Sequence, residues 1–237
     1  MKMNIIFPES KIFFSDLILQ RTDGFIKCGG REVLDRWFKG EQKDHLIDFL
    51  INNDKYEEYM KITMGNYLKE VDEFIKIYKI TNGDHLVSIG PGNGVFETLL
   101  LKKIKFINIL LIDIEDTKSQ KHGFNHKGSG YASLASTKLF LVNNGIPIET
   151  IKICNPRIHN IPKFKFDLLI SLYSMGFHYP CNEYVDFIIK NSSLNSKIIY
   201  DKRRKVIDIG HDKLENNFKY YKKIQKLKHD RVCMLKI

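Results

Sequence analysis

Three glycines at alternate positions follow an apolar run in the first half of the chain, and this pattern constrains the fold more than any other. The run 84–89 leads into Gly90-Pro91-Gly92-Asn93-Gly94, and a helix-forming segment, 95–101, comes next. Alternate glycines let the backbone turn with positive φ and let a ligand approach the main chain where any Cβ would block it. Free N–H groups at the start of the helix would face that ligand. The stretch predicts a buried strand, a tight ligand-binding loop and a helix.

An acidic residue stands at the distance from this loop that suits a nucleoside site. The segment 106–112 is a second apolar run and ends at Asp113, about twenty residues beyond the loop, where an acid in a Rossmann-like βαβ unit accepts hydrogen bonds from ribose hydroxyls. The glycines form G-x-G-x-G and not the dinucleotide fingerprint G-x-G-x-x-G, because Val95 stands where its last glycine would be. Loop and acid together predict a nucleoside site.

The segment Val87 to Gly94 resembles motif I of the class I S-adenosylmethionine-dependent methyltransferases, and Asp113 falls where that family has its ribose-binding acid. The resemblance covers residues 84–200 and implies methyltransferase activity with S-adenosyl-L-methionine as cofactor. It also implies a Rossmann-like α/β fold, with a mostly parallel sheet that ends in an antiparallel hairpin. Many members carry an acid two residues before the first glycine, where this chain has Ser88. That departure leaves one usual contact near the methionine end of the cofactor unassigned.

The same resemblance implies a set of cofactor contacts. Asn155 ends a short strand where family members place a polar residue against adenine, and its amide can both donate and accept hydrogen bonds. Tyr67 lies in a segment that covers the cofactor in the family, although a core tyrosine is the alternative. The predicted cofactor-binding residues are Gly90, Pro91, Gly92, Asn93, Gly94, Asp113, Ile114, Asn155, Ser171 and Tyr67.

The chain divides into a mainly helical cap or lid region, residues 1–80, and a cofactor-binding methyltransferase domain, residues 81–237. In the cap, segment 4–19 fits a strand or a helix, and segment 22–30 is loop-like. Gly65 interrupts a long helical pattern at a cost of about 1 kcal/mol relative to alanine, so it needs a reason such as a kink or a close approach. Apolar periodicity predicts helices at 32–38, 43–51, 56–78, 131–143 and 183–191, and strands at 151–155, 166–173, 197–200, 218–224 and 231–237.

The formal charge of +10 raises the question of a nucleic-acid partner, while an apolar fraction of 43% provides for a full core. Most of the basic residues are lysines, which usually lie on solvated faces, whereas bidentate recognition of phosphate or guanine favours arginine. The composition therefore favours a small acceptor over nucleic acid and leaves nucleic acid open. The arginines are Arg21, Arg31, Arg36, Arg157, Arg203, Arg204 and Arg231.

The cysteines and the apolar runs bear on location. Cys28, Cys154, Cys181 and Cys233 are far apart, with neither C-x-x-C spacing nor a dense disulfide framework. Residues 1–14 lack the apolar core of a signal peptide, and no run reaches the length of a membrane span. A reducing, cytoplasmic location is expected.

A long polar segment, 115–130, follows Asp113 and contains two histidines. His122 and His126 have a spacing that suits a metal on a helix, but the glycines around them argue against a helix there. No metal site is predicted from them.

Chemistry is expected in the turn 174–180, because ligands of open α/β sheets sit beyond the carboxyl ends of the strands. His178 in this turn is a candidate general base for a hydroxyl acceptor, with a packing role as the alternative. Asp201, at the end of the next strand, is the alternative base, or with a nearby carboxylate it could hold a divalent cation. The basic run 201–205 fits a solvated turn, or a contact with an anionic acceptor. DNA amino-methyltransferases have an Asn/Asp-Pro-Pro-aromatic motif after the fourth strand, and its absence here counts against base amino methylation.

The acceptor is indicated only by a diffuse similarity. The helical front region, motif I and the turn 174–179 look like bacterial sugar O-methyltransferases of capsule or lipopolysaccharide biosynthesis, which implies a sugar or related small acceptor. The alternatives are an RNA methyltransferase, favoured by the charge, and a non-catalytic cofactor-binding partner subunit. RNA binding that weakens steeply with salt would separate the RNA hypothesis from the small acceptor.

Overall fold

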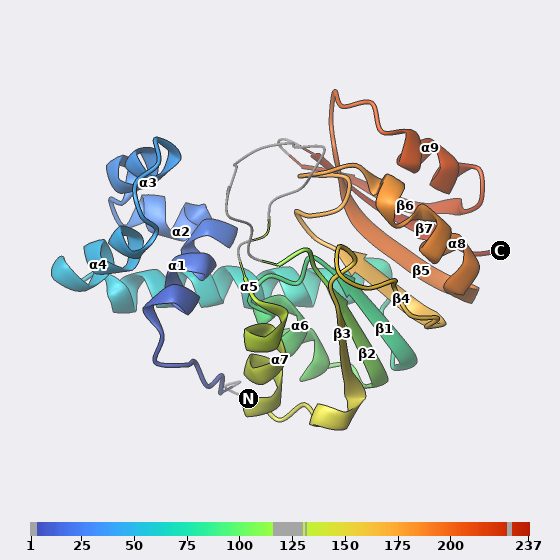
Figure 1. The fold of residues 1–237 in the computed structure, drawn as a ribbon, viewed down its shortest axis with the longest axis horizontal. Helices are drawn as coiled ribbons and strands as arrows, with labels where there is room; N and C mark the ends of the chain where they lie inside the picture. The colour runs from blue at the N-terminus through green and yellow to red at the C-terminus, as the bar shows by residue number, and fades with distance from the viewer. Residues whose placement is uncertain (1–3, 116–129, 131, 227–228) are drawn as a thin grey trace.

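The computed structural model describes residues 4–115, 130, 132–226 and 229–237, and within them the chain forms a seven-stranded sheet preceded by five helices (Figure 1). The strand order is β3-β2-β1-β4-β5-β7-β6; neighbours from β3 to β5 are parallel, and β7 is antiparallel to both β5 and β6. This confirms the predicted fold. The strands are β1 (Gly83–Ile89), β2 (Phe106–Ile112), β3 (Ile151–Cys154), β4 (Phe166–Ser171), β5 (Ser192–Arg203), β6 (Lys219–Gln225) and β7 (His229–Leu235).

Helices cover both faces of the sheet because the apolar strands are buried on both sides. In β1, Leu86 belongs to the core under α5, α6 and α7, whereas Val87 points to the opposite core under α8 and α9. This alternation is the period of two that strand geometry imposes. Among the described helices, none combines the length and apolar character that crossing a membrane requires. The five named here are α5 (Tyr56–Tyr78), α6 (Val95–Leu101), α7 (Leu134–Asn143), α8 (Val185–Asn191) and α9 (Ile209–Glu215).

The first four helices gather at one end of the molecule, and α5 runs from them to the sheet (Figure 1). They are α1 (Lys11–Gln20), α2 (Thr22–Lys27), α3 (Arg31–Phe38) and α4 (Asp44–Asn52). Their buried side chains join those of α5, α6 and one sheet face in a single apolar core. The helical region is therefore packed continuously with the sheet.

Two features of the helical region differ from the sequence-based expectation. Segment 22–27 is a helix and not a loop, and its Gly24 is a packing residue: a Cβ there would lie 2.6 Å from Thr63 Oγ1 on α5. Conversely, Gly65 lies within an unbroken α5, and a Cβ on it would meet no described atom within 4 Å. The segment 4–19, which fitted either a strand or a helix, has no regular structure in residues 4–10 and then forms α1 from Lys11. Ser10 caps α1 by accepting a hydrogen bond from Phe13 N at 3.3 Å.

The basic run 201–205 is also different, because β5 continues through Arg203 and only its end is a turn. Asp201 is fully buried and faces Arg231 on the neighbouring β7. Burial alone would raise the pKa of Asp201, but the Arg231 guanidinium and His229 outweigh it and hold the pKa well below its usual range. The Asp201 carboxylate is therefore charged at neutral pH and is paired with Arg231 on β7. The strand β5 continues into the segment that the sequence indicated as a solvated turn.

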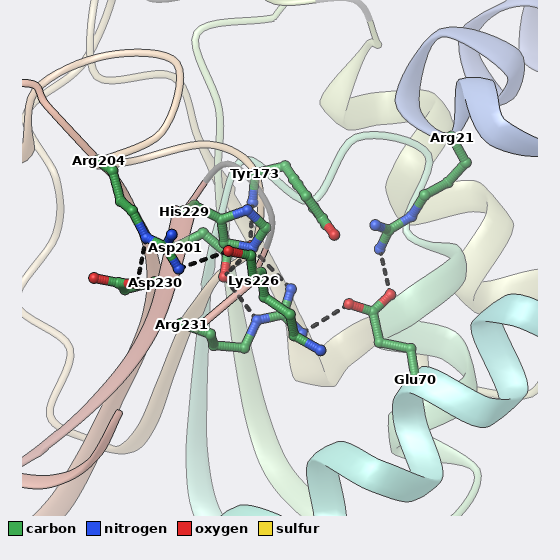
Figure 2. A network of polar contacts seen from close by, with 9 residues as sticks. All are labelled: Arg21, Glu70, Tyr173, Asp201, Arg204, Lys226, His229, Asp230 and Arg231. Carbon is green, nitrogen blue, oxygen red and sulfur yellow. Dashed lines mark hydrogen bonds and ion pairs between the residues drawn. The ribbon is translucent and has the colours of Figure 1, made fainter. Parts of the chain in front are cut away.

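A buried charge network fastens the helical region to the sheet (Figure 2). Arg231 donates to both oxygens of Asp201, at 2.7 and 2.9 Å, and to Glu70 of α5 at 2.7 Å. Glu70 also accepts from Arg21, just after α1, at 2.7 Å. Arg231 is 3% exposed, so its two carboxylate partners replace the water that it has lost. One arginine therefore links β5, β7 and α5.

Replacing Arg231 by leucine is expected to lower the free energy of unfolding by about 3 to 5 kcal/mol, because it leaves the buried Asp201 charge without its main partner. Urea unfolding followed by circular dichroism measures this. The matched control is Arg204→Leu, whose ion pair with Asp230 is more than a third exposed on the arginine side and is expected to contribute about 1 kcal/mol or less. Equal losses in the two variants would contradict the anchoring role of Arg231.

Candidate functional site

A cavity opens at the carboxyl ends of β1, β2 and β4, between the glycine loop, the end of α1 and the turn that follows β4. The predicted residues that line it are Tyr67, Gly90, Pro91, Gly92, Asp113 and His178. They come from segments far apart in the sequence, and the fold brings them to one place. This is the sheet edge at which ligands of open α/β folds bind.

The glycine loop is held from two sides. Gly92 has φ of +57°, and a Cβ on it would lie 2.5 Å from the Gln20 side chain of α1. Asn93 donates through Nδ2 to Phe13 O at 2.7 Å, and its backbone N–H donates to Gln20 Oε1 at 3.2 Å. Gly94 packs against Thr137 and Leu141 of α7. Asn93 and Gly94 thus face protein neighbours and fix the loop, while Gly90 and Gly92 face the cavity.

Asp113 comes directly after β2 and faces the cavity. Burial raises the pKa of Asp113 to about 6, although backbone N–H groups of Glu115, Ile114 and Gly92 favour the charged form. The Glu115 N–H donates to Asp113 Oδ1 at 3.2 Å. A carboxylate in this position can accept hydrogen bonds from two neighbouring hydroxyls.

Three other predicted contacts lie behind the cavity wall. Asn155 donates through Nδ2 to Ile114 O at 3.3 Å and to Glu115 Oε2 at 2.9 Å, so its amide holds the segment that carries Asp113. Ser171 donates to Ile89 O at 2.9 Å and accepts from Met175 N at 2.9 Å. Asn155, Ile114 and Ser171 position the wall from behind.

His178 lies on the cavity wall in the turn after β4. Its backbone N–H donates to Ser174 O at 2.8 Å, and its ring stands edge-on to Phe177 at 4.8 Å between centroids. Ser174 also contacts Tyr179, with 2.7 Å between their hydroxyl oxygens, and lies against Gly90, where a Cβ would overlap it. The turn is therefore packed onto the glycine loop and brings an imidazole to the same cavity as Asp113.

Asp201 does not fit the role of alternative base. Both of its oxygens accept from Arg231, and Oδ2 also accepts from Tyr173 N at 3.0 Å. A carboxylate with a depressed pKa is a weak proton acceptor, and the guanidinium takes the place that a divalent cation would need. His122 and His126, from which no metal site was predicted, lie outside the described residues.

Sequence reasoning missed several cavity residues. The Arg21 guanidinium lies between two aromatic rings, 4.8 Å from the centroid of Tyr67 and 4.6 Å from that of Tyr173. Tyr173 has φ of +54°, a strained conformation for a residue with a side chain, at the point where β4 leads into the turn 174–180. Glu97 in the first turn of α6 also lines the cavity. Glu97 comes right after the glycine loop in the sequence, and this position could have indicated that it belongs to the site. The sequence position of Arg21 gives no such indication.

The cavity is narrow because Gln20 lies over Gly92. It encloses about 110 Å³, compared with about 300 to 1,000 Å³ for most ligand sites. Gln20 Nε2 is buried and has no hydrogen-bond partner among the described residues. A nucleoside ligand must therefore displace this flexible side chain, and the displacement breaks a single hydrogen bond to Asn93.

A second, larger cavity of about 460 Å³ adjoins the first on the helical side. The two share Arg21, Tyr67 and Tyr173 as a common wall. Residues of α2 and α5, among them Lys27 and Asn66, line the far side. A molecule bound there would meet the glycine-loop cavity across this wall.

No family of known proteins matches the chain, and no curated protein matches it. Solved structures match through their folds. The N-methyltransferase NodS from Bradyrhizobium japonicum WM9, in complex with S-adenosyl-L-homocysteine, has a TM-score of 0.51 at 8% identity over 72% of this chain and 86% of its own. Ribosomal protein L11 methylase from Lactobacillus delbrueckii subsp. bulgaricus has a TM-score of 0.49 at 15% identity, over 71% of this chain and 78% of its own.

MtNAS, in complex with MTA and tNA, has a TM-score of 0.48 at 13% identity over 77% of this chain. The chain spans 65% of that protein, slightly less than two thirds of its length. At such low identity these likenesses bear on the fold alone. Together with the strand order, the match to NodS shows that the chain has the fold of class I S-adenosylmethionine-dependent methyltransferases.

Proposed function

We propose that the chain is an S-adenosylmethionine-dependent methyltransferase that O-methylates a sugar or a related small acceptor in surface-glycan biosynthesis. One observation carries the methyltransferase part: the glycine loop and the carboxylate of Asp113 meet in one cavity, at the carboxyl ends of a sheet with the methyltransferase strand order. The acceptor part rests on the diffuse sequence similarity and on the second cavity.

The residues present fit the adenosyl cofactor. The main chain of Gly90 and Gly92 lies open to the cavity apart from the Ser174 and Gln20 side chains, and the half-buried Asp113 offers an acceptor to ribose hydroxyls. When bound, S-adenosylmethionine supplies an activated methyl group. The chain's own task is to hold the acceptor hydroxyl in line with that group and to take up its proton.

His178 is the residue that we assign to proton uptake. It shares the cavity with Asp113 and the glycine loop, and an imidazole titrates in the physiological range. Asp201 is committed to Arg231. The Ser174–Tyr179 contact and the hydrogen bond from His178 N to Ser174 O fix the turn that carries His178 at the cavity wall.

The second cavity favours a small polar acceptor. Tyr67 and Tyr173 offer aromatic surface, and Arg21, Asn66 and Glu70 offer hydrogen-bonding groups. Because the two cavities share a wall, an acceptor bound on the helical side would lie next to the glycine-loop cavity. This arrangement supports a hydroxyl-bearing ligand of sugar size.

An RNA methyltransferase is the second candidate, and one surface feature favours it besides the charge of +10. The strand β6 forms an edge of the described sheet, and its exposed residues include both basic and aromatic types: Lys219, Tyr220, Tyr221, Lys222 and Lys223. Proteins that bind single-stranded nucleic acid combine positive charge with aromatic stacking surfaces.

Incubation with methyl-labelled S-adenosylmethionine and separate pools of glycan precursors and RNA tests the proposal. Mass spectrometry is expected to find the label in a glycan precursor, on oxygen. Label in RNA would move the function to the second candidate, and label in neither pool, with binding of the cofactor retained, would support the non-catalytic partner.

Affinity for 5′-methylthioadenosine, which has the ribose and adenine but no amino-acid portion, is expected to fall about tenfold between pH 8 and pH 5. The sign follows from Asp113, whose pKa is raised to about 6, so that acid protonates the carboxylate that accepts from the ribose. Calorimetry at a series of pH values measures the change. Asp113→Asn should weaken binding at pH 8 and remove this pH dependence; an unchanged pH dependence would place the ribose on another acid such as Glu115.

His178→Ala is expected to lower the turnover number by about a hundredfold to ten-thousandfold, the usual contribution of a general base. Affinity for S-adenosylhomocysteine should stay within about twofold, because the glycine loop and Asp113 are unchanged. Single-turnover kinetics on the labelled acceptor measure the first quantity and calorimetry the second. A variant with full turnover would remove His178 from the chemistry, and one that loses ligand affinity would make it a structural residue.

A further inference from the structure

Glu97 carries a buried oxygen that the described protein leaves unpaired. The residue is 4% exposed and lies in the first turn of α6, directly after the glycine loop. Its Oε1 accepts from Ser88 Oγ at 2.7 Å, whereas Oε2 has no hydrogen-bond partner among the described residues. Buried carboxylate oxygens are normally paired, because leaving one unpaired costs free energy. Because Glu97 also lines the glycine-loop cavity, its unpaired oxygen points to a ligand group that donates to it.

The cation nearest in the cavity is already engaged elsewhere. Arg21 donates to Glu70 at 2.7 Å, and its guanidinium is stacked between the rings of Tyr67 and Tyr173. Burial raises the pKa of Glu97 to about 7, and the negative charge of Asp113 also raises it. The hydrogen bond from Ser88 lowers this pKa but does not outweigh burial. A cation that entered the cavity would reverse this effect and leave Glu97 fully charged.

Ser88 explains how the carboxylate is placed. It is the position two residues before the first glycine, where many class I methyltransferases carry an acid, and in this chain its hydroxyl holds Glu97. The carboxylate next to the glycine loop therefore belongs to Glu97 of α6, which follows the loop, and not to the position of Ser88 in β1, which precedes it. Glu97 and Gly90 line the same cavity.

We infer that Glu97 binds the primary ammonium group of the cofactor's amino-acid portion, with Ser88 as its positioning residue. The inference rests on the proposed function and adds a specificity to it. A nucleoside thioether with an amino-acid portion gains a buried ion pair with Glu97, and one without that portion gains none.

Calorimetry with two ligands tests the inference without an acceptor. S-adenosylhomocysteine has the ammonium and carboxylate groups, and 5′-methylthioadenosine has neither. Glu97→Gln keeps the size of the side chain and a contact with Ser88 but removes the charge. We expect it to weaken S-adenosylhomocysteine binding about tenfold to a hundredfold, the range for a hydrogen bond to a charged group, and to leave methylthioadenosine binding within about twofold.

Ser88→Ala is the second variant, because it frees Glu97 to rotate without removing its charge. It should weaken S-adenosylhomocysteine binding by less than Glu97→Gln does and again leave methylthioadenosine binding unchanged. Equal weakening of both ligands in Glu97→Gln, or no weakening of either, would overturn the inference. If the folded wild-type protein binds neither ligand, the proposed function itself fails and the inference fails with it. Loss confined to S-adenosylhomocysteine is the result that supports both.

Discussion

Close packing of three elements against one glycine loop is the constraint on which the site depends. Ser174 of the turn after β4 lies on Gly90, Gln20 of α1 lies on Gly92, and α7 lies on Gly94. A side chain at Gly90 or Gly94 would overlap Ser174 or the side chains of α7, whereas one at Gly92 would meet the flexible end of Gln20. The glycine loop therefore determines where the helical region, the turn 174–180 and α7 meet. The cavity is the space that remains between them.

The buried charge network keeps this meeting point fixed. Glu70 joins Arg21, beside the cavity, to Arg231 in the sheet, and Arg231 holds Asp201. Asp201 also accepts a hydrogen bond from the backbone N–H of Tyr173, the strained residue that precedes the turn 174–180. Binding at the cavity and packing of the helical region thus share one set of charged side chains. Burial of charge costs free energy, and here it holds the walls of a site in register.

The sheet, the glycine loop and Asp113 could be predicted from the sequence because their signals are local: apolar runs, glycine spacing and an acid at a strand end. The helix α2 could not be predicted because its segment has a loop-like composition, and the role of Gly24, close packing on Thr63, depends on a residue of α5. The extension of β5 was missed because it depends on Arg231, thirty residues further along the chain. The positions of Arg21 and of the Glu97 oxygen that has no partner among the described residues could not be predicted for the same reason, since burial and pairing are set by distant residues.

Binding of S-adenosylhomocysteine to wild-type protein and to Gly92→Val, measured by calorimetry, tests the central claim most directly. Gly92 faces the cavity, and a Cβ there meets only the flexible end of Gln20, but φ of +57° strains any residue with a side chain, so circular dichroism first establishes the conditions under which the variant is folded. The account predicts saturable binding by the wild type and none by the folded variant. Equal affinity in the two folded proteins would contradict the assignment of the glycine loop as the cofactor site.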